Sequence, residues 1–284
     1  MILVTGATGK SGREIVKQLS AAKASVRALV RDSGKAGDLA ALPHVEIFAG
    51  DFNQPDTLDA ALAGVERALL LSSPAPEAVE LQGNFIEAAG RAQTRPHLVK
   101  YSALGADANA PEGFFKWHGQ TEVQLAASGL SYTNLQPTMF MQEILNSWGG
   151  RGDIYLPMDD ARIAVVDIRD IAAVAVKTLT EDGHAGKSYP ITGPESLSFH
   201  DIAEKISAAI GKRVNYVSIS PGDFRKALLG MQMSERFVDA LVQLYDNLRA
   251  GGGAEVSPTV QVVAQKHPIT FAEFAHEHAE TFRG

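Results

Sequence analysis

The short stretch from Ile2 to Gly12 constrains the fold more than any other part of the sequence. Its apolar residues from Ile2 to Val4 lead into three glycines, Gly6, Gly9 and Gly12, which are spaced three residues apart, and a helix is expected to start near Gly12. A strand, a glycine-rich turn and a helix in this order form the start of a βαβ unit. At such a turn, backbone N–H groups and the positive end of the helix meet a phosphate group. The stretch therefore predicts a phosphate-binding turn at the carboxyl end of a strand.

Two kinds of phosphate-binding loop compete for this segment. Residues Gly9-Lys10-Ser11 resemble the end of a nucleoside-triphosphate loop, Gly-x-x-x-x-Gly-Lys-Ser/Thr. That loop requires a glycine at position 4, where the β-branched Val4 stands inside the predicted strand and cannot supply a glycine conformation. The dinucleotide turn fits instead. Gly6 allows the tight turn, Gly9 lets the pyrophosphate approach the backbone, and Gly12 lets the helix pack on the strand.

Strand-like and helix-like segments alternate through the first two thirds of the sequence. Short apolar or β-branched runs are followed by segments whose apolar residues recur at helical spacing. Such repeated units are typical of right-handed crossovers and a parallel sheet that is covered by helices on both faces. The predicted strands are Ile2–Thr5, Ser25–Val30, Val45–Ala49, Ala68–Leu71, His97–Tyr101, Ser131–Leu135 and Ser188–Ile191, and a further helix is predicted at Asp167–Leu179.

After about Gly193 the sequence changes to helices with explicit start signals. Ser198 and Asp201 fit a capping box, and Ser220 followed by Pro221 fits a cap with a proline in the first turn. We therefore predict an α/β fold, a Rossmann-like doubly wound parallel sheet with a smaller, mostly helical C-terminal lobe. Residues 1–150 are predicted to form the NADP-binding domain, with 162–192 adding to it, and 193–284 are predicted to form the substrate-side lobe.

Composition narrows the partners and the chemistry. The net charge is −7 at pH 7 and the basic residues are not clustered, which argues against nucleic acid or an anionic membrane as the main partner. The sequence has no cysteine, which excludes disulfides, thiolate ligands and cysteine nucleophiles. His276 and His278 would diverge by roughly 200° on a helix, so no metal site is predicted. The apolar runs are strand-sized and no signal-peptide pattern is evident, so we expect a cytoplasmic protein.

The end of the second predicted strand bears on the choice between NAD and NADP. An NAD-specific site places a carboxylate there, roughly 20 residues past the glycines. This sequence has Arg31 at that point, whose guanidinium can bind a 2′-phosphate in a bidentate manner, and Lys35 adds a second positive charge. The other interpretation of Arg31 is a solvated charge at a strand end. We predict that NADPH is preferred over NADH by at least about tenfold, as one charge-assisted contact would give.

Several segments together resemble one protein family. VTGATGKSG, ALVRD, GDFNQPDTL and LLLSSP are similar to motifs of the short-chain dehydrogenase/reductase superfamily. TEVQLAASGLSYTNLQP, HAGKSYPITG and HPITFAEF follow in the order of its atypical NmrA-like branch, which includes quinone oxidoreductase type 2 and triphenylmethane reductase. The resemblance implies further contacts with the cofactor, at the adenine, the ribose and the nicotinamide. With the loop, the candidate cofactor-binding residues are Gly6, Thr8, Gly9, Lys10, Ser11, Gly12, Arg31, Lys35, Asp51, Phe52, Ser72, Ser73 and Pro137.

The usual catalytic pair of the superfamily is changed in this sequence. The superfamily uses Tyr-x-x-x-Lys on a helix, and the resemblance of HGQTEVQLAAS places Phe114 at the tyrosine position and His118 at the lysine position. Phe114 cannot donate a proton, so ketone reduction, which forms an alkoxide, is disfavoured. We expect His118, with a pKa near neutral, to stabilise a nascent oxyanion or to bind ribose, or else only to pack against its helix. Quinone and dye reductases of the branch also carry histidine there.

The acceptors that need no strong acid are flat and aromatic. A reduced quinone is an anion that aromatisation already stabilises, and a cationic dye carbon needs no proton, so hydride transfer rests on positioning. Ser102, Phe114, Met139 and Phe140 are the candidate pocket residues, although methionine and aromatic residues at such a spacing belong more often to a core. The leading hypothesis is an NAD(P)H-dependent reductase of quinones or similar planar electrophiles. The alternative is a non-catalytic NADP sensor with a regulatory protein partner, and the existence of a homodimer stays open.

Overall fold

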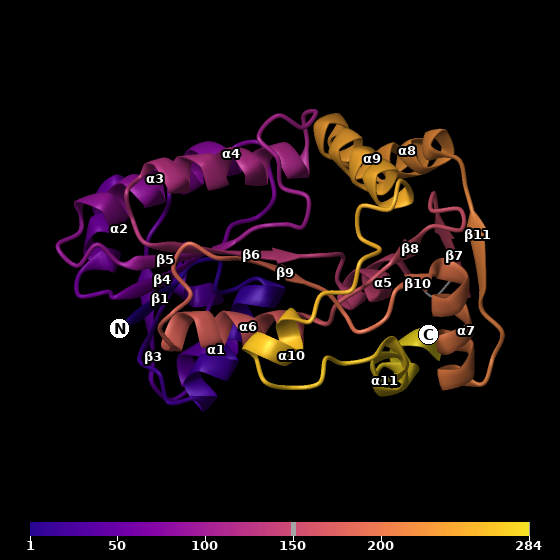
Figure 1. Ribbon diagram of the computed structural model, residues 1–284, viewed down its shortest axis with the longest axis horizontal. Coiled ribbons are helices and arrows are strands. Elements are labelled where there is room, and N and C mark those ends of the chain that lie inside the picture. Colours follow the sequence, from indigo (N-terminus) through magenta and orange to yellow (C-terminus); the bar gives the residue numbers. More distant parts are fainter. Residues whose placement is uncertain (149–151, 284) are drawn as a thin grey trace. The chain divides into compact units, whose positions relative to one another are not determined.

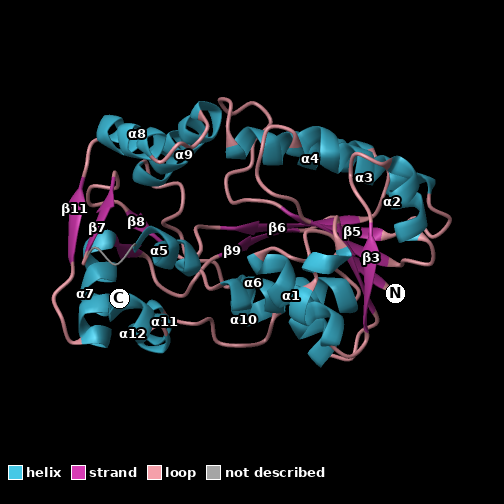
Figure 2. Ribbon diagram, turned by 180° about the vertical axis from the view of Figure 1, so that it is seen from behind, coloured by secondary structure: helices cyan, strands magenta, loops and turns pink. Residues whose placement is uncertain are grey.

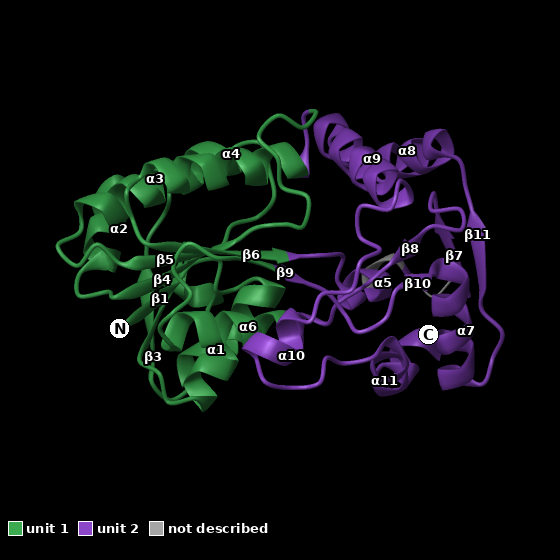
Figure 3. Ribbon diagram, in the orientation of Figure 1, with its two compact units in different colours: residues 1–111, 115–136, 171–189 green, residues 112–114, 137–170, 190–284 purple. Residues whose placement is uncertain are grey.

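The strands that alternate with helices along the sequence form a seven-stranded sheet. The computed structural model describes residues 1–148 and 152–283 and divides into two compact units. The first unit contains residues 1–111, 115–136 and 171–189, and the second contains 112–114, 137–170 and 190–284 (Figure 3). The domain boundary predicted at residue 150 lies outside the described residues, and the boundary predicted at 193 stays a prediction.

The sheet has seven strands in the order β3-β2-β1-β4-β5-β6-β9. The strands from β3 to β6 pair in parallel, and β9 lies beside β6, where the Asn134 N–H donates to the Lys187 carbonyl. The order reverses between β1 and β4, and this is the point of a doubly wound sheet at which ligands bind. The strands are β1 (Ile2–Val4), β2 (Val26–Val30), β3 (Val45–Ala49), β4 (Arg67–Leu70), β5 (His97–Tyr101), β6 (Tyr132–Pro137) and β9 (Ser188–Ile191).

Helices cover both faces of this sheet because each presents an apolar face to it. In α1, for example, Ile15, Val16 and Leu19 are fully buried. The helices are α1 (Lys10–Ala21), α2 (Pro55–Leu62), α3 (Ala78–Arg91), α4 (Phe114–Ala127) and α6 (Ile168–Thr180). Figure 1 shows α2, α3 and α4 on one side of the sheet and α1 and α6 on the other, and Figure 2 shows the same layers from behind. The predicted doubly wound α/β fold is therefore confirmed, and β3, β5 and β9 have the predicted bounds.

The second unit is mostly helical, as predicted for the C-terminal part of the chain. Ser198 and Asp201 form the predicted capping box, and Ser220 caps a helix whose first residue is Pro221. The buried rings of Phe199, Phe271 and other aromatic residues form its core. The helices are α5 (Met141–Trp148), α7 (Phe199–Ile210), α8 (Pro221–Gly230), α9 (Glu235–Arg249), α10 (Thr259–Val263), α11 (Phe271–Glu277) and α12 (Ala279–Arg283).

Two small sheets in this unit were not predicted. The strand β7 (Asp153–Leu156) pairs in parallel with β11 (Asn215–Ser218), and β8 (Arg162–Ile163) pairs antiparallel with β10 (Leu197–Ser198). Strands of two to four residues are too short for a period-two pattern to show in the sequence. Across the described part of the chain, the helices are all too short or too polar to cross a membrane.

Candidate active site

The glycine turn after β1 is held against β4 by a buried threonine. The Thr5 hydroxyl lies 3.0 Å from the Leu69 carbonyl oxygen and 2.8 Å from that of Leu71, and it accepts the Leu71 N–H at 2.8 Å. Gly6 follows with a φ of 60°, in the left-handed region, and a Cβ there would lie 2.8 Å from the Leu71 carbonyl oxygen. Both the conformation and the close approach therefore require glycine at position 6.

The start of α1 lies as close to this turn as the backbone allows. A Cβ at Gly12 would lie only 2.2 Å from the Gly6 carbonyl oxygen, so any larger residue would push the helix away. Gly9 stands at the N-cap without a side chain to satisfy the first N–H groups, and no acidic residue occupies the first turn. The positive end of the helix is therefore uncompensated, which favours an anion there. This geometry fits a dinucleotide pyrophosphate, the predicted ligand of the turn.

The side chains of the glycine turn and of the start of α1 differ in their exposure. Thr8 and Lys10 are exposed, and Ser11 is partly buried. The Tyr101 hydroxyl, at the end of β5, donates to the Ser11 oxygen at 3.1 Å. Burial raises the pKa of Tyr101 well above its usual range, although the hydrogen bond to Ser11 opposes this shift. Tyr101 is therefore a structural link between β5 and α1, and a poor proton donor for a substrate.

The two basic residues predicted to read the 2′-phosphate are exposed after β2. Arg31 precedes a 3₁₀ turn, Ser33–Lys35, and Lys35 ends it. The intervening Asp32 caps that turn, since its carboxylate accepts the Gly34 N–H at 2.9 Å. Within the described residues neither Arg31 nor Lys35 has an ion-pair partner. By contrast, Arg13 and Lys17 on α1 both bind Asp38, so Arg31 and Lys35 are the uncommitted cations of this region.

The turn after β3 is stabilised by hydrogen bonds among its own residues and with the start of α2. The Asp51 carboxylate accepts the Asn53 N–H at 2.9 Å through Oδ1, and the Asp51 N–H donates to the Thr57 hydroxyl at 3.0 Å. The Phe52 ring packs on Phe85 with 5.4 Å between the ring centroids. Asp51 thus has the geometry of a turn residue, and its second oxygen, Oδ2, is the one that a nucleotide could reach.

A buried polar residue on α3 that the sequence analysis missed, Gln82, contacts the turn after β4. Ser72 is partly buried, and its hydroxyl accepts the Gln82 Nε2 at 2.8 Å, while the neighbouring Ser73 is exposed. Gln82 is 3% exposed, and its Oε1 has no hydrogen-bond partner among the described residues. A buried amide oxygen without a donor costs free energy, so this position fits a ligand that donates a hydrogen bond.

A second missed residue, Lys100, lies under α4. It sits on β5 with 0% of its surface exposed, and its Nζ lies 3.1 Å from the Tyr101 carbonyl oxygen and 3.2 Å from His118 Nδ1. Burial lowers the pKa of Lys100 from 10.5 to about 7, and the Glu122 carboxylate partly opposes this shift. The signal in the sequence was a lone charged residue inside the apolar strand HLVKY.

The pKa of His118 therefore differs from the value expected from the sequence. Burial and the Lys100 charge hold the pKa of His118 well below its usual value. The expected pKa near neutral is wrong, because the imidazole is buried and the charge of Lys100 adjoins it. At pH 7 the ring is neutral, and it acts as a hydrogen-bonding group rather than as a cation.

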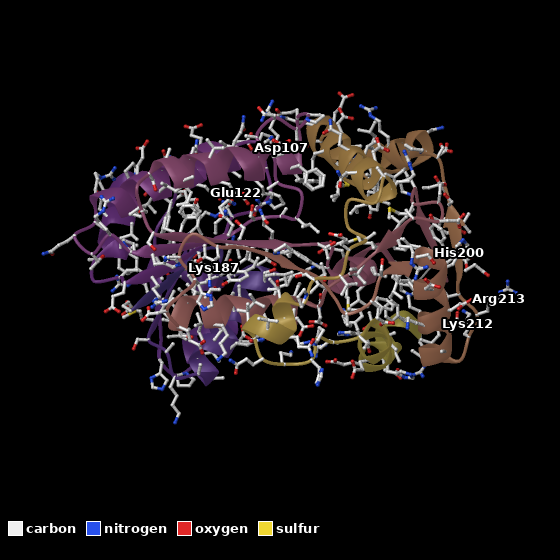
Figure 4. The ribbon with its side chains drawn as sticks, in the orientation of Figure 1. Asp107, Glu122, Lys187, His200, Lys212 and Arg213 are labelled. Carbon is white, nitrogen blue, oxygen red and sulfur yellow. The ribbon has the colours of Figure 1, made fainter. Side chains whose placement is uncertain are left out.

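Polar side chains from β5 and β6 complete this cluster. Lys100 pairs in register with Asn134, so both side chains face α4, and Ser102 and Gln136 two residues on face the same way. The Ser102 hydroxyl and the Gln136 Nε2 both donate to Glu122, which lies between α4 and the sheet (Figure 4). The hydroxyl proton of Ser102, a candidate pocket residue, is thus engaged by Glu122.

The remaining candidate residues belong to the second unit. The Phe114 ring contacts Phe237 edge-on, with 5.5 Å between centroids. Pro137 is buried, and Met139 is partly buried against the core of the unit. Phe140 forms a β-bridge with Val166. Met139 therefore has the packing that is typical of a core residue.

A doubly wound sheet with a glycine turn and an uncompensated helix end at its switch point defines a dinucleotide-binding Rossmann protein. The chain belongs to the NmrA-like family, which residues 1–275 match. The resemblance stated from the motifs is thereby confirmed.

Relatives in sequence and structure span the whole chain. It is 39% identical to an NAD(P)H azoreductase of Xenophilus azovorans over 99% of both chains, and 30% identical to quinone oxidoreductase 2 of Escherichia coli over 96% of both. The crystal structure of the NADPH complex of the E. coli enzyme is similar, with a TM-score of 0.88, 29% identity, and 98% of this chain and 99% of that one covered. The Citrobacter triphenylmethane reductase with NADP(H) has a TM-score of 0.84, 25% identity, and 98% and 100% coverage.

Proposed function

We propose that this protein is an NAD(P)H-dependent reductase of planar aromatic acceptors, such as quinones and azo compounds. The predicted class, an NAD(P)H-dependent oxidoreductase, is that of the named azoreductase and quinone oxidoreductase relatives. The observation that carries the proposal is the approach of Gly12 to Gly6, which brings the uncompensated end of α1 to the turn where a pyrophosphate binds. When bound, the cofactor supplies a hydride. The chain supplies its binding, its orientation and a proton.

The finer preference, NADPH over NADH, is supported by the charges after β2. Arg31 and Lys35 are exposed and unpaired among the described residues, while Asp32 is engaged by the Gly34 N–H. A 2′-phosphate would find two cations there, while one oxygen of the intervening Asp32 carboxylate is already engaged within its own turn.

The class of acceptor follows from the hydroxyl groups and the histidine near β5, none of which is placed as a strong acid for an alkoxide. Of the two hydroxyls at the end of this strand, Tyr101 donates to Ser11 and Ser102 donates to Glu122. Phe114 stands where the superfamily has its tyrosine, and the pKa of His118 is held well below its usual value. Ketone reduction would need a strong, well-placed acid for the alkoxide. A reduced quinone or azo group makes a smaller demand, because its anion is delocalised.

The test is NADPH oxidation with a panel of quinones, azo dyes and simple ketones, together with calorimetry of NADPH and NADH. We expect turnover of the first two classes, little with ketones, and tighter binding of NADPH. Micromolar binding of NADPH without turnover of any acceptor would overturn the proposal in favour of a sensor. A cytoplasmic location, a homodimer and a protein partner stay predictions.

A further inference from the structure

The buried lysine under α4 has no structural reason to be charged. Lys100 has 0% exposure, and its hydrogen-bond partners are a backbone carbonyl and an imidazole nitrogen, neither of which is an anion. Burying an ammonium group without a hydrogen-bonded carboxylate is costly, and a methionine would fill the same space without that cost. A group kept at such a cost beside a cofactor loop is a candidate for function.

We propose that Lys100 and His118 form a proton relay that serves the reduced acceptor, with Lys100 as the positioning residue that acts through His118. The inference rests on the proposed reductase function. It adds the source and the path of the proton, which hydride transfer to a quinone or azo group leaves to be supplied.

The geometry fixes the direction of the relay. The Lys100 ammonium lies 3.2 Å from His118 Nδ1 and donates to it, so the neutral imidazole carries its own proton on Nε2. Lys100 is fully buried, while His118 as a residue is only partly buried. Of the two residues His118 is therefore the less buried, and the relay assigns its Nε2–H as the group that an acceptor meets.

The step balances in atoms and charge. Hydride addition to a quinone leaves an oxyanion on the acceptor. As the His118 Nε2–H bond breaks and an O–H bond forms, an N–H bond of the Lys100 ammonium breaks and the proton binds His118 Nδ1. The products are the protonated acceptor, a neutral Lys100 amine and a neutral His118 in its other tautomer. A hydronium ion or buffer acid of the solvent then gives a proton to Nε2, and the Nδ1 proton returns to Lys100, which restores the ammonium group.

The acidities match this direction. With a pKa of about 7, Lys100 gives its proton readily to a phenolate-like oxygen, whose conjugate acid has a pKa of about 10. The pKa of His118 is well below its usual value, so the ring passes a proton on without storing it as a cation.

Among the groups around the pair, Glu122 is the carboxylate that changes the pKa of Lys100. It raises the pKa of Lys100 while it accepts hydrogen bonds from Ser102 and Gln136. On β4 and β6, Leu70 and Asn134 stand at the register of Lys100, and neither is ionisable. In the loop that packs against α4 at Gly119, Asp107 accepts the Asn109 N–H at 2.8 Å (Figure 4).

The experiment compares the wild type with Lys100→Met, which removes the charge and keeps the length of the side chain. Lys187→Met is the matched control, because Lys187 is exposed. Wild-type kcat with a quinone is expected to fall as pH rises through about 7, because the relay needs the protonated lysine. In Lys100→Met we expect kcat at pH 6 to be lower by about tenfold to hundredfold and the pH dependence to be lost, with KM for NADPH unchanged. The control is expected to match the wild type.

Parallel pH profiles in the wild type and Lys100→Met would overturn the relay, even with reduced rates, because they would mark a merely structural role. An acceptor that needs no proton, a cationic triarylmethane dye, is expected to be reduced by both proteins within about twofold wherever the wild type reduces it. If Lys100→Met does not fold, His118→Gln cuts the same path and is expected to show the same selective loss.

A readout without turnover separates this inference from the proposed function. In ¹⁵N NMR of the cofactor-free protein, His118 is expected to be neutral and to carry its proton on Nε2 between pH 6 and 7, where Lys100 is still largely protonated. A wild-type His118 that titrates near 6.5 would overturn the relay while leaving the reductase intact. Absence of turnover with every acceptor would overturn the reductase function, and the relay with it, whatever the NMR shows of the pair.

Discussion

A Cβ atom at Gly12 would lie 2.2 Å from the carbonyl oxygen of Gly6. The two glycines therefore set how closely α1 approaches the turn that precedes it, and this approach places the helix end where we propose that a pyrophosphate binds. Gly12→Ala is expected to displace α1 and to weaken NADPH binding by about tenfold to hundredfold, the scale of a typical overpacking strain. Calorimetry measures the change. Gly90→Ala in α3 is the control, because a Cβ there meets no atom within 4 Å. An affinity equal to that of the control would contradict the role of Gly12.

Arg31 provides the test of cofactor preference. Arg31→Ala is expected to weaken NADPH by about tenfold and to leave NADH nearly unchanged, because only the 2′-phosphate contact is lost. Fluorescence titration with both cofactors measures the two dissociation constants. Lys17→Ala removes a cation that is already paired with Asp38 and is expected to change neither. A parallel loss for both cofactors in Arg31→Ala would show that the residue does not read the phosphate.

The cost of the buried lysine predicts a pH-dependent gain of stability on its removal. The folded-state pKa of Lys100 is lowered from 10.5 to about 7, so its penalty is fully present below pH 7 and is relieved as pH rises toward 10.5. Lys100→Met is therefore expected to be more stable than the wild type at pH 6, and this advantage is expected to shrink by about 1.4 kcal/mol per pH unit above pH 7. Urea unfolding from pH 6 to 9 measures it. A constant difference across this range would contradict the lowered pKa.

Glu122 predicts a shift in the same titration. Its carboxylate raises the pKa of Lys100, so Glu122→Gln is expected to lower that pKa further below 7. The pH at which quinone reduction falls would then move to a lower value, while the neutral amide can still accept from Ser102. The pH profile of kcat is the measurement. Glu87→Gln on α3 serves as the control at an exposed carboxylate. If both variants had the same pH profile, the effect of Glu122 on the pKa of Lys100 would be contradicted.

The threonine behind the turn predicts a loss of stability. Thr5→Val keeps the shape of the side chain but removes the hydroxyl that accepts the Leu71 N–H. We expect a loss of about 1–3 kcal/mol in the free energy of unfolding, because a backbone donor loses its partner. Urea unfolding measures the loss, with Thr180→Val at an exposed helix position as the comparison. Equal stabilities of the two variants would show that water replaces the hydroxyl.

The prediction from sequence succeeded where one local pattern determines the outcome. The order of strand, glycine turn and helix required the dinucleotide fold, and the apolar runs gave β3, β5 and β9 their bounds. It failed where two distant segments combine. Lys100 and His118 are 18 residues apart, and they meet because α4 covers that face of β5. In a strand buried on both faces, apolar periodicity does not say which helix lies over which side chain.

The two units are interleaved along the chain, since each is assembled from three separate stretches. Neither could be exchanged whole and alone by a single genetic recombination, because any one cut divides at least one of the two units. New acceptor preferences in such a chain are expected to arise by substitution and by changes of loop length, rather than by transfer of a whole module. Residues 137–170 and 190–284 are where that diversification would be sought.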